Sequence, residues 1–193
     1  MKLVRNKWFL LAVIAIIGLA IDVYTKNLAE TKLSRGQTSS VIGQTLEFTL
    51  VYNKAAIFGL DPRKALPWFP LNGFFVVFSI VAVILLFYFY ANIQSKDWLM
   101  RLGVALILPG ALGNLSDRVL HMHKGVVDFI KVDLGFAPFD PWPIFNMADS
   151  YVSVGVTIIM LCFIRDEFFG KKKQSTRQEP ATPAQSLSNE NSG

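Results

Sequence analysis

Carboxylates are the groups in this chain best suited to chemistry, because several of them lie in or beside strongly apolar segments. The aspartates concerned are Asp22, Asp117, Asp128, Asp133 and Asp149. When two carboxylates lie close together they cannot both ionise, so one keeps a proton while the other is free to accept one. Such a pair can deprotonate a water molecule and protonate a scissile carbonyl, which is the chemistry of peptide hydrolysis.

Two of these aspartates have structural explanations in the sequence itself. Asp22 and Lys26 are four residues apart on an expected helix, and Asp117 directly precedes Arg118. We therefore interpret Asp22 and Asp117 as members of ion pairs, with Lys26 and Arg118 respectively, that orient the helices.

Elimination reduces the number of candidates among the other three aspartates, although their positions in the sequence do not by themselves identify a catalytic pair. Asp133 is expected to be exposed on a strand, which leaves Asp128 and Asp149 as candidates. Serine catalysis is not indicated, because the chain contains no GxSxG motif. The GxGD motif of other intramembrane aspartyl proteases is absent as well.

Cysteine and metal chemistry are weaker alternatives. The single cysteine, Cys162, lies late in the last apolar segment. His121 and His123 have the i, i+2 spacing that places two side chains on one face of a strand, where a metal could bind. A pair of interfacial histidines is the simpler interpretation, so no metal and no cofactor is predicted.

The elements that must position these groups are membrane helices, so we expect a mainly α integral membrane protein. Of the 193 residues, 52% are hydrophobic, which is more apolar side chain than a soluble core of this size buries. A hydrocarbon core of about 30 Å requires about 20 apolar residues. Four segments qualify, at residues 8–28, 71–93, 98–119 and 145–164. A single domain over 1–170 is expected, followed by a polar, disordered cytoplasmic tail at 171–193.

The first apolar segment has an alternative interpretation as a cleavable signal peptide. Basic residues precede Trp8, and Gly18 and Ala20 have small-x-small spacing. Against cleavage, Asp22 and Lys26 continue the helix as an acid-to-base pair. The uncleaved helix is therefore favoured.

The net charge of +5 indicates topology, and nucleic-acid binding is not predicted. Basic residues are dense before the first segment and after the last, whereas residues 29–70 hold five in 42. Both termini are therefore expected in the cytoplasm. Residues 29–70 and 120–144 then lie outside, and residues 94–97 form a short cytoplasmic turn.

The polar residues of the helices are expected to meet at the extracytoplasmic face. A rise of about 1.5 Å per residue places Asp22, Asn114 and Asp117 near the outer ends of their helices. Asn146 and Asp149 begin the inward-running fourth helix at the same depth. Because charge inside a bilayer is unfavourable, this collection predicts a functional site.

Two segments outside the helices predict a small β-sheet lying on the outer leaflet. Residues 45–52 alternate apolar and polar side chains, and residues 125–134 form a second β-like segment. Such a sheet would hold Asp128 close to the outer ends of the helices.

A small proton-coupled transporter or channel is the alternative function, because acidic residues in helices also mark ion paths. A transporter site is expected near the midplane, whereas these residues collect at one face. A purely structural scaffold would leave that collection unexplained. A membrane aspartyl endopeptidase is therefore the leading hypothesis.

Four sequence boxes, in order, resemble those of the bacterial lipoprotein signal peptidases, also called type II signal peptidases. The boxes are DVYTK at 22–26, GNLSDR at 113–118, VVDF at 126–129 and FNMAD at 145–149. Each box is weak by itself, but four at matching membrane depth are a specific signal. The likeness runs from Asp22 to Ser153 and so covers nearly the whole membrane part.

The resemblance implies that Asp128 and Asp149 form the catalytic dyad, in agreement with the elimination above. The residues implied to order the site and the substrate backbone are Asn53, Asn114, Arg118 and Asn146. The implied reaction is cleavage of prolipoproteins before a diacylglyceryl-modified cysteine, and the implied inhibitor is the cyclic peptide globomycin. The implied setting is the bacterial cytoplasmic (inner) membrane, with membrane lipid around a multi-pass chain that we expect to be a monomer.

The chain departs from the family pattern at three positions. Where the family has NxGAAF, this chain has Ala55 and Ile57 within residues 53–58, and Pro109 stands where a second Gly is usual. Ile57 adds bulk beside the expected cleft. The position of that loop, and its substrate preference, therefore do not follow from the resemblance.

Overall fold

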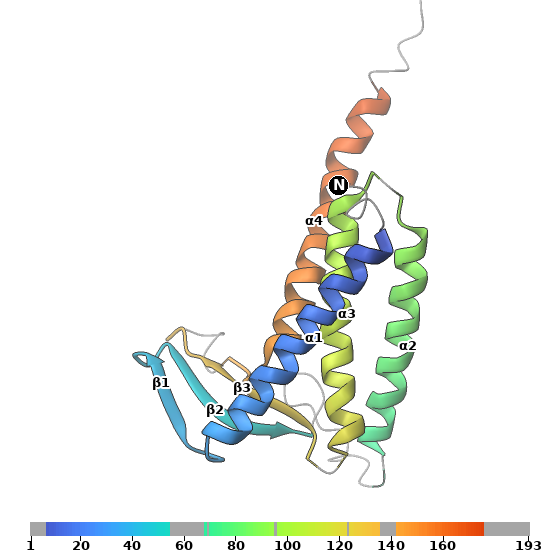
Figure 1. Ribbon diagram of the computed structural model, residues 1–193. Helices are drawn as coiled ribbons and strands as arrows, with labels where there is room; N and C mark the ends of the chain where they lie inside the picture. Colours follow the sequence, from blue (N-terminus) through green and yellow to red (C-terminus); the bar gives the residue numbers. More distant parts are fainter. Residues whose placement is uncertain are drawn as a thin grey trace, which may run out of the picture. The chain divides into compact units, whose positions relative to one another are not determined.

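A computed structural model describes residues 7–54, 68, 70–94, 96–122, 124–135 and 142–175, with only the backbone described for 169–175. The helices are α1 (Lys7–Lys32), α2 (Leu71–Asn92), α3 (Trp98–Leu120) and α4 (Met147–Ser175), and the strands are β1 (Thr38–Ile42), β2 (Leu46–Asn53) and β3 (Val126–Val132) (Figure 1). The chain divides into two compact units, Met1–Ile159 and Met160–Gly193. The site described below lies wholly in the first.

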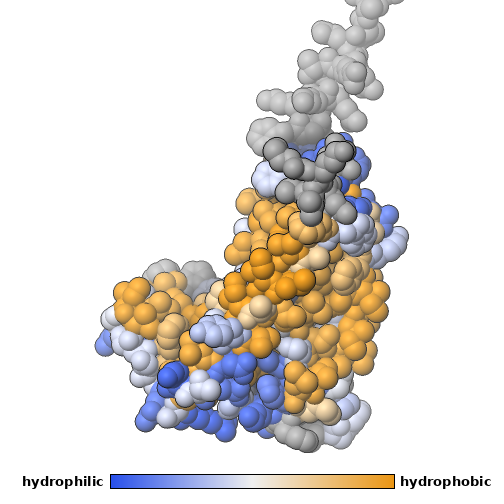
Figure 2. All heavy atoms as spheres, in the orientation of Figure 1, coloured by the Kyte–Doolittle hydropathy of each residue, from blue (hydrophilic) through white to orange (hydrophobic). Residues whose placement is uncertain are grey.

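All four helices are long and apolar enough to cross a membrane, which confirms the predicted fold class. Their surfaces carry large apolar side chains that the protein itself does not cover. In α2, for example, Val77, Phe78 and Ile84 are exposed, and only Leu71 and Tyr90 are buried. Figure 2 shows these apolar surfaces along the helices and hydrophilic side chains gathered where the sheet joins them. Lipid is the solvent that suits such a surface.

Small residues allow α3 and the first part of α4 to approach closely. A Cβ atom on Gly103 would lie 2.9 Å from the carbonyl oxygen of Gly155, and one on Gly110 would collide with the carbonyl oxygen of Ala148. Pro109 is buried within α3 and packs against Gly18 of α1. Pro109, a departure from the family pattern, thus belongs to the α1–α3 contact.

The strands form one antiparallel sheet in the order β1-β2-β3. The predicted strands correspond to β2 and β3, whereas β1 was not predicted, because all its residues are exposed and it shows no buried face. The segment before the fourth helix also joins the sheet, since Phe145, two residues before α4, and Ile130 exchange backbone hydrogen bonds of 3.0 and 2.8 Å. This pairing explains why α4 begins at Met147, two residues later than predicted.

The fourth helix is longer than expected at its other end. It continues to Ser175, past the predicted start of the tail at residue 171. Lysine and glutamine are good helix formers, so this polar stretch can extend an existing helix. Residues 176–193 of the predicted tail lie outside the described residues.

Candidate active site

Asp128 projects from β3 and is 2% exposed. Its carboxylate accepts hydrogen bonds from Asn53 Nδ2 at 2.9 Å and Asn146 Nδ2 at 2.7 Å. Burial, followed by the negative charge of Asp149, raises the pKa of Asp128 to about 7, and this exceeds the lowering by the two amides and Lys26. At neutral pH a large fraction of molecules therefore holds a proton on Asp128.

Asp149 lies in the first turn of α4 and is partly exposed. Asn114 Nδ2 donates to Asp149 Oδ1 at 2.8 Å, and the backbone N–H of Asn146 donates to Oδ2 at 3.2 Å. In return, the backbone N–H of Asp149 donates to Asn146 Oδ1 at 3.0 Å. This reciprocal arrangement is a helix-capping box, and it surrounds the carboxylate with N–H donors.

Asn146 links the two aspartates. It is fully buried, its side chain contacts Asp128, and its backbone and side chain contact Asp149. The pairing of Phe145 with Ile130 sets this position, because it fixes the start of α4 against β3. The structure therefore brings the two candidate aspartates to one site.

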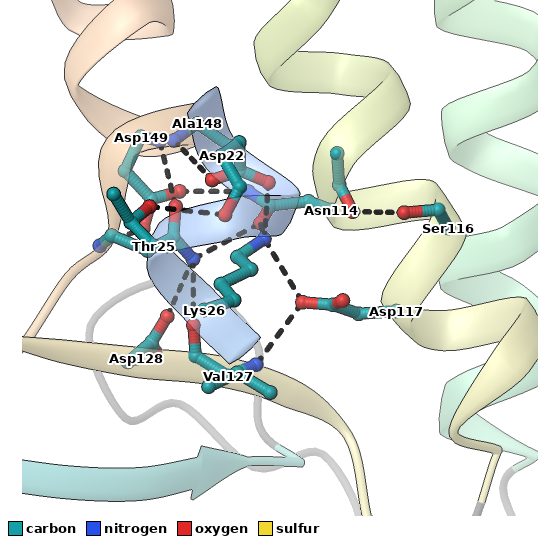
Figure 3. Close-up of polar contacts among 12 residues, drawn as sticks. Asp22, Thr25, Lys26, Asn114, Ser116, Asp117, Val127, Asp128, Ala148 and Asp149 are labelled. Carbon is teal, nitrogen blue, oxygen red and sulfur yellow. Dashed lines mark hydrogen bonds and ion pairs between the residues drawn. The ribbon is translucent and has the colours of Figure 1, made fainter. Parts of the chain in front are cut away.

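Lys26 lies between two further aspartates (Figure 3). Its Nζ is 2.7 Å from Asp22 Oδ2, which is the predicted ion pair, and 2.9 Å from Asp117 Oδ2. The predicted partner of Asp117 was wrong: the aspartate pairs with Lys26 of α1 instead of with Arg118. Consecutive residues on a helix do not face each other, whereas α1 packs directly against α3.

Arg118 points elsewhere. Its Nη1 donates to the backbone oxygen of Asn114 at 3.1 Å, and its guanidinium lies 5.1 Å from the centre of the Phe75 ring. The charges of Asp128, Asp149 and Asp117 all act on it, although the described side chains of Arg118 and Asp117 form no ion pair. Arg118 thus supplies positive charge beside the two candidate aspartates.

Comparison with known proteins identifies the protein family that has this arrangement. The family described as "Signal peptidase (SPase) II" matches residues 14–165. This chain belongs to the signal peptidase II family. One similar protein is the lipoprotein signal peptidase of Staphylococcus haemolyticus (strain JCSC1435), 34% identical over 80% of this chain and 90% of that protein. Another is the lipoprotein signal peptidase of Francisella tularensis subsp. novicida (strain U112), 37% identical over 88% of this chain and 96% of that protein.

Solved structures agree with this family assignment. A bacterial membrane enzyme determined at 2.3 Å resolution has a TM-score of 0.69 and 30% identity, covering 89% of this chain and 93% of its own. A second, determined at 1.9 Å, has a TM-score of 0.68 and 32% identity, covering 81% and 93%. The chain is therefore a multi-pass membrane peptidase of the aspartic type, and the transporter alternative is not favoured.

The structure of this signal peptidase also bears on the metal hypothesis. His121 Nδ1 lies 3.9 Å from Asp117 Oδ1, whereas His123 lies outside the described residues. Within the described part of the chain, no group of three or more His, Cys, Asp or Glu side chains could hold a metal ion. Asp133 lies just beyond β3, partly exposed, and accepts the N–H of Gly135.

Sequence reasoning missed one polar residue at the edge of the site. Asn72, in the first turn of α2, donates to the backbone oxygen of Arg118 at 3.0 Å. Both residues line a cavity of about 640 Å³, whose walls also include Lys54, Val76 and Met122. A lone asparagine at the start of an otherwise apolar segment was the available signal. Ala55 and Ile57, which depart from the family pattern, lie outside the described residues.

Proposed function

We propose that this signal peptidase cleaves prolipoproteins before a diacylglyceryl-modified cysteine, with Asp128 and Asp149 as the catalytic pair. The observation that carries the proposal is that Asn146 donates hydrogen bonds to both carboxylates. Asp128 is buried, whereas Asp149 is partly exposed. Two carboxylates in such different surroundings differ in their tendency to hold a proton, which is what acid–base hydrolysis requires.

The geometry supports distinct roles for the two aspartates. Asp149, partly exposed and surrounded by N–H donors, acts as the base that takes a proton from water. Asp128, whose pKa is raised to about 7, gives its proton to the scissile carbonyl oxygen as water attacks. Asp149 then gives its proton to the amide nitrogen while Asp128 takes a proton from a hydroxyl of the tetrahedral diol. The C–N bond breaks, the amine and the carboxylic acid leave, and both aspartates are back in their starting protonation states.

The substrate is proposed to approach through the cavity beside Arg118. That cavity adjoins the start of α2, and several of its walls are apolar, including Leu71, Val76 and Met122. A cysteine carrying two acyl chains would be held by the surrounding lipid at the depth of the helix ends. Beyond the hydrogen bonds that they donate to the backbone oxygens of Arg118 and Asn114, Asn72 and Arg118 have further N–H groups for the peptide backbone.

The direct test is cleavage of a purified diacylglyceryl-modified prolipoprotein by the purified, full-length peptidase in lipid. We expect a mobility shift on gels for the modified substrate, at least about tenfold faster than for the unmodified one, because acyl chains raise its concentration in the membrane. Globomycin, the inhibitor implied by the family resemblance, should abolish the shift. Equal rates for the two substrates would contradict the proposed lipid requirement.

We further propose that both termini lie in the cytoplasm and that the site faces the outside of the cytoplasmic membrane. The basic residues flanking the first and last spans support this orientation. Reporter fusions at residue 95 and at the C-terminus should give cytoplasmic signals, and fusions near residues 40 and 135 external ones. An external C-terminus would rule out the orientation.

A further inference from the structure

Lys26 is a buried cation with three oxygen atoms close to its ammonium group. The residue is 3% exposed, and its Nζ lies 2.7 Å from Asp22 Oδ2, 2.9 Å from Asp117 Oδ2 and 3.2 Å from Asn114 Oδ1. The contacts with the two aspartates are ion pairs, and the contact with Asn114 is a hydrogen bond that Lys26 donates. We call these four residues the Lys26 cluster. Burying three charged groups is unfavourable unless their geometry is good, so we expect a functional role for this arrangement.

The two aspartates of the Lys26 cluster accept hydrogen bonds from the backbone next to each aspartate of the proposed dyad (Figure 3). Asp117 Oδ2 accepts the N–H of Val127 at 3.1 Å, and Val127 immediately precedes Asp128. Asp22 Oδ1 accepts the N–H of Ala148 at 2.9 Å, and Ala148 immediately precedes Asp149. Asp117 and Asp22 therefore each fix the residue directly before one of the proposed catalytic aspartates.

The third member of the Lys26 cluster reaches the dyad directly. Asn114 Oδ1 faces Lys26, so its Nδ2 is turned towards Asp149 Oδ1, at 2.8 Å. Gly113, beside it on α3, leaves room for the cluster, because a Cβ atom there would collide with Asp22 Oδ2. Close packing thus keeps the cluster in one arrangement.

We propose that Lys26 is a positioning residue, which fixes Asp128 and Asp149 relative to each other. It does so by bridging the carboxylates of Asp117 and Asp22, which accept the backbone N–H groups of Val127 and Ala148. This inference rests on the proposed function of the dyad. Neither backbone contact is between neighbours in sequence, since Asp22 and Ala148 are 126 positions apart. A bridge through one cation allows α1 to fix β3 and α4 against each other.

Lys26 also acts on the dyad through its charge. The charged groups that act on Asp128 are Lys26 of α1, Arg118 of α3 and Asp149 of α4. Lys26 lowers the pKa of Asp128, opposing burial and the charge of Asp149, which raise it to about 7. Because Asp128 must hold a proton to act as the acid, activity should fall as pH rises through about 7. Without the Lys26 charge, that fall should move to higher pH.

The two aspartates of the Lys26 cluster offer a matched pair of substitutions. In Asp117, one oxygen, Oδ2, accepts both Lys26 Nζ and the Val127 N–H, so an asparagine oxygen can replace it. Its amide nitrogen would then face His121 Nδ1. In Asp22, two different oxygens accept Lys26 Nζ and the Ala148 N–H, so asparagine turns an N–H donor towards another donor.

The test compares Asp22→Asn, Asp117→Asn and Lys26→Met in full-length peptidase, measuring kcat, KM and the pH profile of cleavage. Asp22→Asn and Asp117→Asn remove the same charge and the same volume, and differ only in hydrogen bonding. We expect Asp22→Asn to lower kcat on the order of 10- to 10²-fold, and Asp117→Asn only about threefold. Lys26→Met should lower kcat about 10²-fold with KM little changed, and should move the alkaline fall to higher pH.

Lys131→Met is the control, because it removes a 2.7 Å ion pair with Glu47 on the sheet, outside the Lys26 cluster. It should leave kcat and the pH profile unchanged. Equal effects of Asp22→Asn and Asp117→Asn on kcat would overturn the proposal. If Lys26→Met does not fold, this comparison of the two aspartate variants is the deciding test. Folded Lys26→Met with a normal kcat and pH profile would overturn the proposal as well. Failure of the dyad itself is seen separately, as normal cleavage by Asp128→Asn.

Discussion

Replacement of Asp128 by Asn, or of Asp149 by Asn, should lower turnover by at least about 10²- to 10⁴-fold. Asparagine keeps the size of each side chain and one of the two hydrogen bonds that its carboxylate accepts, but it removes the group that gains or loses a proton. At Asp128 it also removes a carboxyl group whose pKa is raised to about 7. The proton on that carboxyl group is the one that the proposed acid donates. Turnover of a diacylglyceryl-modified prolipoprotein measures the loss.

The double substitution distinguishes a catalytic pair from two independent sites. Groups that act as one unit are strongly non-additive, so the double variant should be little worse than the poorer single one. Membrane insertion should survive, because neutralising a carboxylate at the edge of the bilayer relieves a desolvation penalty. Normal cleavage by either single variant, in protein shown to be folded, would end the assignment of Asp128 and Asp149 as the dyad.

The fold was predictable from sequence because its main signals are local. Twenty-residue apolar segments identify membrane helices, and the period-2 pattern of residues 45–52 identified β2. Helix ends were less predictable, since they depend on partners elsewhere in the chain. The start of α4 at Met147 follows from the pairing of Phe145 with Ile130, which no local pattern contains.

The site was predictable as a set of residues but not as a set of contacts. Polar residues in apolar segments are expensive, so composition alone singled out Asp22, Asn114 and Asp117. Their partners depend on how helices pack: Asp117 was assigned to its neighbour Arg118, whereas the structure pairs it with Lys26 of α1. The backbone donors of the Lys26 cluster carry no sequence signal, because every residue except proline has an N–H.

Replacement of Asn146 by Ala should be nearly as damaging as the loss of a catalytic carboxylate. Asn146 is fully buried, and its Nδ2 lies 2.7 Å from Asp128 Oδ1 and 3.2 Å from the carbonyl oxygen of Val127. Alanine leaves these buried acceptors with fewer donors and removes the cap on the N–H of Asp149. We expect the free energy of unfolding to fall by about 2–3 kcal/mol, and turnover by about 10²-fold as the carboxylates lose their fixed separation.

The same substitution has a signature in the pH profile. The amide of Asn146 lowers the pKa of Asp128, so its removal should raise that pKa and move the alkaline fall in activity to higher pH. Asn92→Ala is the matched control, because Asn92 is exposed at the end of α2 and its Nδ2 donates locally, to the backbone oxygen of Tyr88 at 2.7 Å. Thermal unfolding in detergent and turnover across pH 5–9 measure both variants. If Asn146→Ala is folded and turns over within about threefold of the unmodified protein, the two carboxylates do not depend on this residue for their arrangement.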